Sequence, residues 1–489
     1  RLKKMSNAFF KIKNSYNSLT LTKKAVIWFT LATIIQNGIS FLVTPIYTRI
    51  LSDSEYGIYS VFQSWQQIIS IISIVALDRC IPVGFMKFSN EKEGFLSSIQ
   101  TLMTLLVFVW TALVCIFPNF FENLIKLPVY MVITMLLVSL MNNTLANWSW
   151  YQRYNYNYKK LASVTVVSTL LMQIISVISV IILPFENKGN VMVMSMSLAR
   201  ILMYGIVYYS VFVNGKSIFN KQHWCFSLKF SLAVVPHALA QIILNSSDRI
   251  MIDNFCGREE TAFYSVTYSS AMVLNTIMTS ISSAVQPWYY EKIKVKDFES
   301  IKKLTNNLLI LSAFFSVGVS LFAPEILGIM APSSYHDAIW VFPSIAASVY
   351  FNSMYLYFAN FESYYEKPFY FSIATTTGAV VNIILNFFMI PKFGFVAAGY
   401  TTLLCYILFA IMHYIFMRKV CNEKLEGKVV FDVKFIILLS LFVLTLTLGV
   451  TILYKNIVIR YMIILFIALL VIYNRKKIIN ELNRIIKKK

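Results

Sequence analysis

The stretch VMVMSMSLARILMYGIVYYSVFV, residues 191–213, carries a single charged side chain, Arg200. A helix of about 20 apolar residues crosses the roughly 30 Å hydrocarbon core of a bilayer at 1.5 Å per residue. The whole chain agrees, because 58% of its 489 residues are hydrophobic and 13% are charged. A water-soluble core does not explain this composition. Residues 191–213 are therefore predicted to form a transmembrane helix.

Thirteen further apolar runs predict a polytopic, all-α membrane protein with fourteen transmembrane helices. The predicted spans are 25–47, 58–80, 97–117, 128–147, 161–183, 191–213, 228–253, 262–287, 305–330, 338–361, 369–390, 395–417, 435–454 and 457–473. The first span lacks a small-residue cleavage site, so it is predicted to be an anchor and not a signal peptide. The cysteines lack C-x-x-C spacing and are predicted to be buried free thiols. They are Cys80, Cys115, Cys225, Cys256, Cys405 and Cys421.

Basic residues are distributed unevenly between the two sides of the predicted bundle. With the N-terminus inside, the inner segments hold 34 of the 43 lysines and arginines, and the outer loops hold six. Cytoplasmic loops are enriched in Lys and Arg, so both termini are predicted to be cytoplasmic. This distribution explains the net charge of +21 without a nucleic-acid partner. The tail, 474–489, either lies along the anionic inner leaflet or is a solvated segment that enforces orientation.

An internal repeat relates the first six spans to the next six. A shift of 205 residues aligns Gln36 with Gln241 and Glu55 with Glu260, and it maps the first six runs onto runs seven to twelve. Repeats of six helices have the same orientation, which implies a pseudo-two-fold axis along the membrane normal and two lobes that can rock about a central cavity. The predicted parts are a basic cytoplasmic N-terminus (1–24), an N-lobe (25–213), an inter-lobe linker (214–227), a C-lobe (228–417), a cytoplasmic loop (418–434), two C-terminal helices (435–473) and a basic cytoplasmic tail (474–489).

Polar side chains lie within several predicted spans. Arg200 is at mid-depth of the sixth span, where an ionised side chain costs at least about 2.5 kcal/mol unless it is solvated or paired. It either faces a substrate or forms a structural ion pair. In the seventh span, polar residues recur at helical spacing and are expected to line a cavity. The predicted cavity residues are Arg200, Arg249, Arg79, Arg49, Gln36, Gln63, Gln67, His237, Gln241, Asn245 and Asp248.

No nucleotide-binding loop of the Walker type occurs, and no cofactor or metal is expected. The predicted energy source is an ion gradient, the concentration gradient of the lipid itself, or consumption of the product outside. For a proton or sodium gradient, the candidate coupling-ion groups are His237, Asp78, Asp248 and Glu325. His237 either binds a proton, since the ordinary pKa of imidazole is about 6.5, or forms a hydrogen bond with a neighbouring carbonyl.

Two stretches resemble a known family: TPIYTRILSDSEYGIYSV (Thr44–Val61) and VVPHALAQIILNSSDRIMIDNF (Val234–Phe255). Both are similar to the Wzx-type O-antigen and capsule repeat-unit flippases of the multidrug/oligosaccharidyl-lipid/polysaccharide exporter superfamily. Residues 76–80, 322–338 and 382–399 extend the resemblance over nearly the whole chain.

The shared motifs consist mostly of turn and packing residues. Gly57 and Gly394 are expected to permit close approach or positive φ. Pro45 and Pro391 are expected to end helices. The family commonly has glycine where this chain has Ala76 and Ala262, and each change is expected to be tolerated.

The resemblance implies a flippase and not an enzyme. Its cargo would be an undecaprenyl-diphosphate-linked oligosaccharide, moved from the inner to the outer leaflet of a bacterial inner membrane for O-antigen or capsule biosynthesis. Arginines would hold the diphosphate, and amide side chains would contact the sugar. The other implied partners are the bilayer and a polysaccharide polymerase with its chain-length machinery. The protein is expected to be a monomer.

Two alternatives are less favoured. A multidrug or cation antiporter of the same superfamily would need acidic residues deep in a lobe, and none is found at mid-depth of the predicted spans. A membrane glycosyltransferase or polymerase would need a catalytic domain, but every predicted outer loop is short. Asp53 and Glu55 in the first outer loop offer a metal-binding pair, although such residues more often form a solvated turn.

Overall fold

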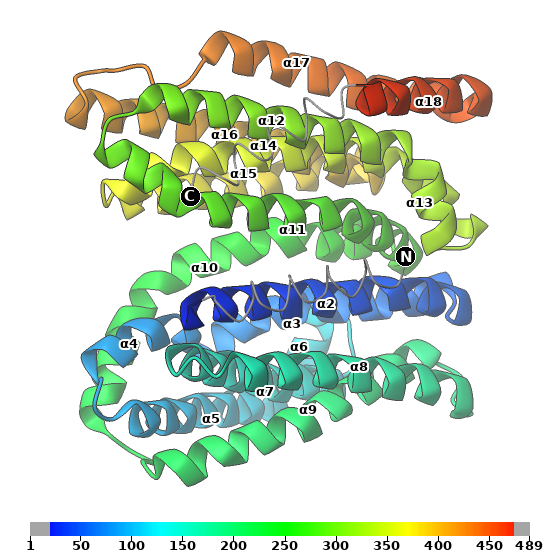
Figure 1. Ribbon diagram of the computed structural model, residues 1–489. Helices are drawn as coiled ribbons and strands as arrows, with labels where there is room; N and C mark the ends of the chain where they lie inside the picture. Colours follow the sequence, from blue (N-terminus) through cyan, green and yellow to red (C-terminus); the bar gives the residue numbers. More distant parts are fainter. Residues whose placement is uncertain (1–19, 474–489) are drawn as a thin grey trace, which may run out of the picture. The chain divides into compact units, whose positions relative to one another are not determined.

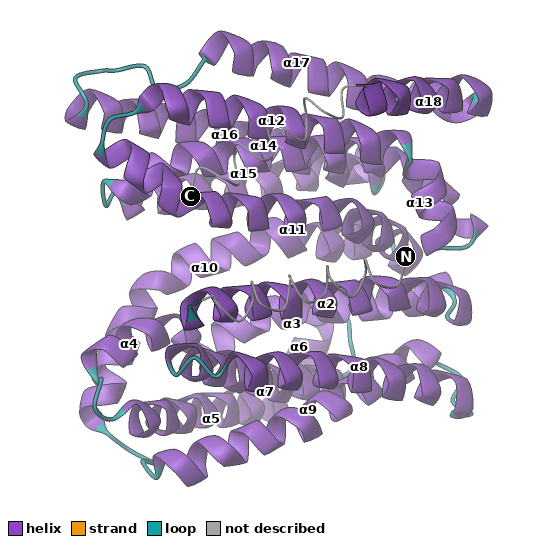
Figure 2. Ribbon diagram, viewed as in Figure 1, coloured by secondary structure: helices purple, strands orange, loops and turns teal. Residues whose placement is uncertain are grey.

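The computed structural model describes residues 20–473, and all of its regular elements within that range are helices (Figure 2). The all-α prediction is confirmed. Residues 1–19 and 474–489, which hold most of the predicted basic N-terminus and the basic tail, lie outside the described residues.

One compact unit comprises the described residues up to Val266, together with residues 330–334 and 372–398. In this unit α2 packs against α8 and α8 against α9, and α3 contacts α7, α9 and α10 (Figure 1). Its helices are α2 (Leu21–Ile50), α3 (Asp53–Ile74), η1 (Leu77–Cys80), α4 (Ile81–Lys87), α5 (Lys92–Ile116), α6 (Pro118–Ile125), α7 (Val129–Tyr154), α8 (Tyr158–Ile182), α9 (Lys188–Gly215) and α10 (Lys221–Phe255).

A second compact unit comprises residues 267–329, 335–371 and the described residues from Gly399 onward. In this unit α12, α14 and α17 pack against one another. Its helices are α12 (Phe298–Leu321), α13 (Ala323–Met330), η2 (Ser333–Val341), α14 (Phe342–Tyr364), α17 (Val433–Gly449), η3 (Val450–Lys455) and α18 (Ile457–Tyr473). Of these, α13 and η2 also contribute residues 330 and 333–334 to the first unit. Three further helices contribute residues to both units: α11 (Arg258–Lys294), α15 (Pro368–Phe393) and α16 (Val396–Lys424).

Each of the fourteen predicted spans corresponds to a helix. In the described part of the chain, ten helices are long and apolar enough to cross a membrane, and α3 with η1 and α4 adds an eleventh as a bent pair. Helix α18 contributes a shorter apolar segment. Helices α11 and α14 are long but more polar, and α14 buries polar side chains such as Asn352 and Glu362 inside the protein. The structure therefore establishes a multi-pass helical protein, while the count of fourteen spans remains a prediction.

The helix boundaries repeat with the offset found in the sequence. A shift of 205 residues places both ends of α6 on the ends of α13, the first residue of α3 on that of α11, and the last residue of α5 on that of α12. The repetition therefore holds where sequence identity is low. It breaks at Val75 and Ala76, which interrupt α3, whereas the corresponding part of α11 is continuous.

The interruption after α3 has a backbone cause. Val75 and Ala76 have φ values of 55° and 50°, in the left-handed region that disfavours residues with a Cβ. The chain there turns by 62° before η1 and α4. The predicted span 58–80 is thus two helical segments, and similarly the predicted span 305–330 contains the end of α12 and all of α13.

The two motif glycines act as predicted. A Cβ on Gly57 would overlap the carbonyl oxygen of Arg258, so only glycine permits this approach of α3 to the start of α11. Gly394 has a φ of 71° between α15 and α16. The proline prediction is wrong, because α2 continues past Pro45 to Ile50 and α15 continues past Pro391 to Phe393. Each proline removes only one backbone donor, and both lie within the last two turns of their helices.

The cysteine prediction is partly correct. All six thiols are free, and Cys80, Cys405 and Cys421 are buried. Cys115 and Cys225 are exposed on the protein surface. Other apolar side chains of the same helices are exposed as well. Membrane helices are apolar on both their packed and their lipid-facing sides, so hydrophobicity does not distinguish the two.

Replacing Ala76 with glycine is expected to raise the free energy of unfolding by up to about 1 kcal/mol, because glycine adopts positive φ without the Cβ penalty. Thermal unfolding of the purified protein in detergent would measure this. Ala262→Gly is the matched control, since Ala262 is equally buried but lies within continuous α11. It is expected to lose about 0.5–1 kcal/mol. Equal destabilisation by both substitutions would contradict the assigned strain.

Candidate functional site

A polar cavity of about 260 Å³ lies inside the first compact unit. Helices α2, α3, α7, α8 and α9 supply its walls, and most lining side chains carry amide or hydroxyl groups. The lining residues are Gln36, Ser40, Gln63, Gln66, Asn142, Thr169, Met172, Gln173, Met196, Arg200 and Tyr204. Three residues predicted from sequence, Gln36, Gln63 and Arg200, therefore meet in one cavity.

Arg200 is the one permanently charged side chain in this lining. It is half-buried, and within residues 20–473 it forms no hydrogen bond and no ion pair. The phenol groups of Tyr59 and Tyr204 lie within electrostatic range of its guanidinium group. The ion pair considered from the sequence is thus absent among the described residues. The five N–H donors of the guanidinium are available to a planar anionic group.

Hydrogen bonds hold the amide groups around Arg200 in place. The Tyr47 hydroxyl donates to Gln173 Oε1 at 3.0 Å, which links α2 to α8. Gln66 Nε2 donates to Ser139 Oγ at 3.4 Å, which links α3 to α7. These contacts connect neighbouring walls, so the cavity is organised before any ligand enters it.

Gln67 does not join the cavity. It is exposed on α3, and its side chain donates to the backbone carbonyl of Gln63 at 3.4 Å. Gln66, on the adjacent face of the same helix, lines the cavity instead. A rotation of about 100° per residue separates these positions, and the sequence alone does not show which face points inward.

The predicted polar face of α10 divides into exposed and buried positions. Gln241 is exposed, His237 is half-buried, and Asn245 Nδ2 donates to the Gln241 carbonyl at 2.8 Å. Asp248 is only 1% exposed. None of these four side chains lines the cavity that contains Arg200.

Asp248 belongs to a buried hydrogen-bond network among α10, α11 and α15. The Tyr264 hydroxyl donates to one carboxylate oxygen at 2.6 Å, and Asn386 Nδ2 donates to the other at 2.6 Å. Ser247 donates to Asn382 Oδ1 at 3.2 Å. Sequence reasoning missed the asparagines, although their spacing of four residues in an apolar run marks one helix face.

The remaining arginines mostly have local partners. Arg249 donates to Ser265 Oγ and to the Asn245 carbonyl, each at 3.1 Å. Arg49 is exposed at the end of α2 and donates to the Pro45 carbonyl at 2.9 Å. Arg79 lies 3.2 Å from Asp78, with its side chain 47% exposed. These interactions favour local structural roles over membership of the cavity.

The candidate coupling residue Glu325 lies in the second unit. Arg460 on α18 donates to Glu325 Oε1, and the Tyr461 hydroxyl donates to the same oxygen at 2.8 Å. Arg460 is only 2% exposed, so this pair attaches the last described helix to the start of α13. The sequence placed Arg460 inside a span but did not provide its partner.

Asp53 and Glu55 lie in the first turn of α3. Glu55 and Ser52 make a reciprocal capping box at the beginning of α3. Glu55 also accepts a hydrogen bond at 2.7 Å from the Lys188 backbone N–H, and Asp53 accepts one at 3.1 Å from Ser334. No cluster of three or more metal-binding side chains occurs within residues 20–473. The turn interpretation fits these contacts.

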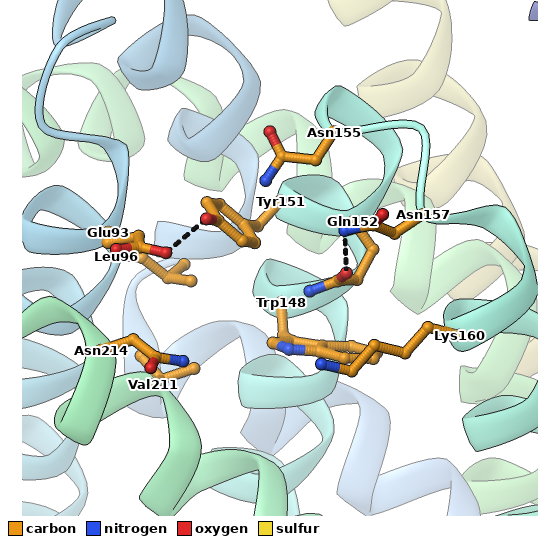
Figure 3. Close-up of a pocket in the computed structure, with 10 residues that line it drawn as sticks. All are labelled: Glu93, Leu96, Trp148, Tyr151, Gln152, Asn155, Asn157, Lys160, Val211 and Asn214. Atoms are coloured by element: carbon orange, nitrogen blue, oxygen red, sulfur yellow. Dashed lines mark hydrogen bonds between the residues drawn. The ribbon is translucent and has the colours of Figure 1, made fainter.

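A second cavity, of about 250 Å³, lies at the ends of α5, α7, α8 and α9 (Figure 3). Glu93 accepts a hydrogen bond from the Tyr151 hydroxyl, and Asn157 Nδ2 donates to Gln152 Oε1 at 3.1 Å. Its lining residues are Glu93, Leu96, Trp148, Tyr151, Gln152, Asn155, Asn157, Lys160, Val211 and Asn214. The sequence did not predict this cavity, because polar residues at the ends of spans are expected in any case.

Sequence comparison adds a family match. The model of a family described as polysaccharide biosynthesis protein matches residues 22–293. An uncharacterized membrane protein of Methanocaldococcus jannaschii is 23% identical over 444 residues, which are 83% of this chain and 85% of that protein. A probable low-salt glycan biosynthesis flippase of Haloferax volcanii is 22% identical over 221 residues, which are 44% of each chain.

Comparison with solved structures supports the fold. The lipid II flippase MurJ in an inward closed conformation matches with a TM-score of 0.65 and 15% identity, over 93% of this chain and 99% of that one. An inward-facing multidrug resistance transporter of the MATE family and MOP superfamily matches with a TM-score of 0.59 and 11% identity, over 81% and 96%. The helical arrangement is thus one that both kinds of transporter share.

The charge of Arg200 is expected to make the cavity selective for anions. In a variant without its native cysteines, Gln63→Cys should react faster with an anionic than with a cationic methanethiosulfonate reagent. Arg200→Gln should reduce the ratio of the two rates by roughly tenfold, because one unit charge at short range steers the reagent. Stopped-flow or mass-spectrometric labelling would measure it. Gln67→Cys serves as the control, and an equal change at both positions would argue against the cavity.

Proposed function

The chain belongs to the polysaccharide biosynthesis protein family, and on this basis we propose that it is a flippase for a lipid-linked oligosaccharide. The cargo we propose is an undecaprenyl-diphosphate-linked repeat unit, carried from the cytoplasmic to the outer leaflet of a bacterial inner membrane for O-antigen or capsule biosynthesis. The glycan flippase and the lipid II flippase among the similar proteins support this class of cargo. The protein would work with its termini in the cytoplasm, as a monomer that supplies a polysaccharide polymerase.

The unpaired Arg200 in the polar cavity carries the proposal. A diphosphate is strongly solvated and does not enter hydrocarbon unless charge and hydrogen bonds replace its water. A guanidinium group supplies both, in a bidentate geometry that suits phosphate oxygens. An arginine without a protein partner gains the most from such an anion, because its own desolvation is then compensated.

The amide lining suits the sugar part of the cargo. Gln36, Gln63, Gln66 and Gln173 each present both donor and acceptor groups, which match the hydroxyls of a sugar. The cavity has a volume of about 260 Å³. That space accommodates a diphosphate or a single sugar residue. We therefore assign the cavity to the headgroup next to the lipid, while the polyprenyl chain remains in the bilayer.

The cavity chemistry disfavours the cation-antiporter alternative. A cationic drug would meet Arg200, and no Asp or Glu lines the cavity to attract it. The repulsion between like charges in a site of low dielectric is larger than in water. The fold itself does not discriminate, because MATE transporters share it.

Energy coupling remains a proposal. Among the four candidate groups, Asp78 and Glu325 are held by arginines and His237 is half-buried. Asp248 is the most buried of the four and is held by the neutral donors of Tyr264 and Asn386. We propose that one of these four groups binds a coupling proton or sodium ion where a gradient drives transport. Alternating access by two lobes is part of the same proposal, and the internal repeat supports it.

Arg200→Gln is expected to reduce translocation at least tenfold while leaving the protein in the membrane, because the diphosphate loses its charged partner. Cells carrying the variant as the only copy should accumulate the lipid-linked intermediate on the cytoplasmic side. Extraction of these lipids with mass spectrometry would detect it. Arg200→Lys should retain partial activity, since it keeps the charge but not the bidentate geometry.

Arg153→Gln is the matched control for this experiment. Arg153 lies over the Trp150 ring, 5.1 Å from its centroid, and does not line the cavity. Its loss should leave translocation near the wild-type level. Wild-type amounts of surface polysaccharide in the Arg200→Gln strain would remove Arg200 from the proposed site. Unchanged lipid intermediates with new sensitivity to cationic drugs would favour the antiporter.

A further inference from the structure

A buried pair of ionisable side chains lies in the second unit, away from every group predicted from the sequence. His413 Nδ1 on α16 lies 2.9 Å from Glu362 Oε1 and 3.0 Å from Glu362 Oε2 on α14. The His413 side chain is 2% exposed and the Glu362 side chain is 0% exposed. Both carboxylate oxygens thus face one imidazole nitrogen in a site that excludes solvent.

Aromatic rings enclose the imidazole. Tyr355 stacks on it with the ring centroids 5.0 Å apart and an interplanar angle of 24°. Phe371 meets it edge-on at 5.2 Å, and Phe409 and Phe416 lie at 6.3 and 6.4 Å. These rings provide no permanent charge, so the pair is in a low-dielectric environment. Its two members must therefore compensate each other.

Nearby charged groups have other partners. On the same helix as His413, Arg418 donates to the carbonyls of Gly427 and Lys428. Lys367 before α15 pairs with Glu423 at 3.0 Å. Other charges at these helix ends also have partners: Lys419 lies 5.8 Å from the centroid of the Tyr370 ring, and Asp432 caps α17 by accepting from the Phe435 N–H. Each of these charged groups therefore has a partner other than Glu362, whereas His413 contacts Glu362 directly.

Proton binding changes the net charge of this pair in a simple way. With ionised Glu362 and neutral His413, Nδ1–H donates to the carboxylate and the buried site carries a charge of −1. One further proton gives either a carboxylate with an imidazolium or a carboxylic acid with a neutral imidazole. Both arrangements have zero net charge. Because an uncompensated buried charge is costly, the site has a physical reason to bind that proton.

We propose that Glu362 and His413 form a proton-binding site that couples a pH gradient to the transport cycle. The coupling part rests on the proposed flippase function, whereas proton binding itself does not. The ligand is a single proton, exchanged between a site with a charge of −1 and a neutral one. Histidine suits this role, since its ordinary pKa near 6.5 lies within the range of cellular pH.

Proton binding can be measured directly, because the chain has only four histidines. In the purified full-length protein labelled with ¹⁵N-histidine, substitution of His223, His237 and His336 one at a time assigns the remaining signal to His413. The spectra are recorded between about pH 5 and 9, and a proton bound by the pair is expected to change this signal. In Glu362→Gln the pH response of the signal should differ from that of the wild type, because the imidazole has lost its carboxylate partner. A His413 signal that is constant over this range in the wild type would overturn the proposal.

Glu423→Gln is the control for Glu362→Gln. It removes a carboxylate from the same helix as His413, but from an exposed pair with Lys367. The His413 titration should be unchanged in this variant. An equal shift in both variants would show that the titration reports general surface charge and not the buried pair. Assignment through the other histidines keeps the test valid even if Glu362→Gln fails to fold.

Coupling is tested in proteoliposomes with a lipid-linked oligosaccharide extracted from the source cells. Wild-type flipping should accelerate several-fold when a pH gradient is imposed, and Glu362→Gln should lose this acceleration. A gradient response that persists in Glu362→Gln would overturn the coupling role. If the wild type does not flip the lipid at all, the proposed function fails, while a titrating His413 would still establish the proton site.

Discussion

The structure depends on one constraint: a polar group inside a bilayer has no water and must be satisfied by the protein itself. Helices satisfy their own backbone groups, and many side chains follow the same rule. Ser60 donates to the Tyr56 carbonyl, and Thr144 donates to the Leu140 carbonyl, each one turn earlier. These bonds allow polar residues to be buried without any tertiary partner. Long-range polar contacts are then reserved for groups that a helix cannot satisfy locally.

Arginines show most clearly what this constraint implies. Arg249, Arg418 and Arg460 each donate to carbonyl, hydroxyl or carboxylate groups of the protein. The fold is therefore able to satisfy a guanidinium group where it has a structural role. Arg200 differs, because no described residue pairs with it and amide side chains surround it. Such a group supports the proposal that Arg200 binds an anion from outside the protein, since a purely structural arginine would be expected to have a partner like those of the other three.

The sequence predicted the features that depend on local pattern and missed those that depend on packing. Apolar runs predicted a helix for every span, and the 205-residue repeat predicted the shared boundaries of α6 and α13. Gln36, Gln63 and Arg200 were predicted because polar groups within spans are costly wherever they point. Gln67 was also predicted to line the cavity, but it is exposed. The sequence does not show which face of a helix points inward, because the rotation of the helix about its axis depends on packing. The interruption at Val75 was missed because neither Val75 nor Ala76 is a typical turn residue.

Glu362 and His413 were missed for a different reason. Each lies near the predicted inner end of a span, where charged residues are ordinary, and 51 positions separate them. Only the packing of α14 against α16 turns two ordinary residues into a buried pair. The same physical constraint then applies to this pair and to Arg200, although the charge of the pair is negative and that of Arg200 is positive. An unpaired guanidinium is compensated by an anion, and a buried carboxylate beside a neutral imidazole is compensated by a proton. A single rule about buried charge thus underlies both proposals, the anionic headgroup at Arg200 in one unit and the proton at Glu362 and His413 in the other.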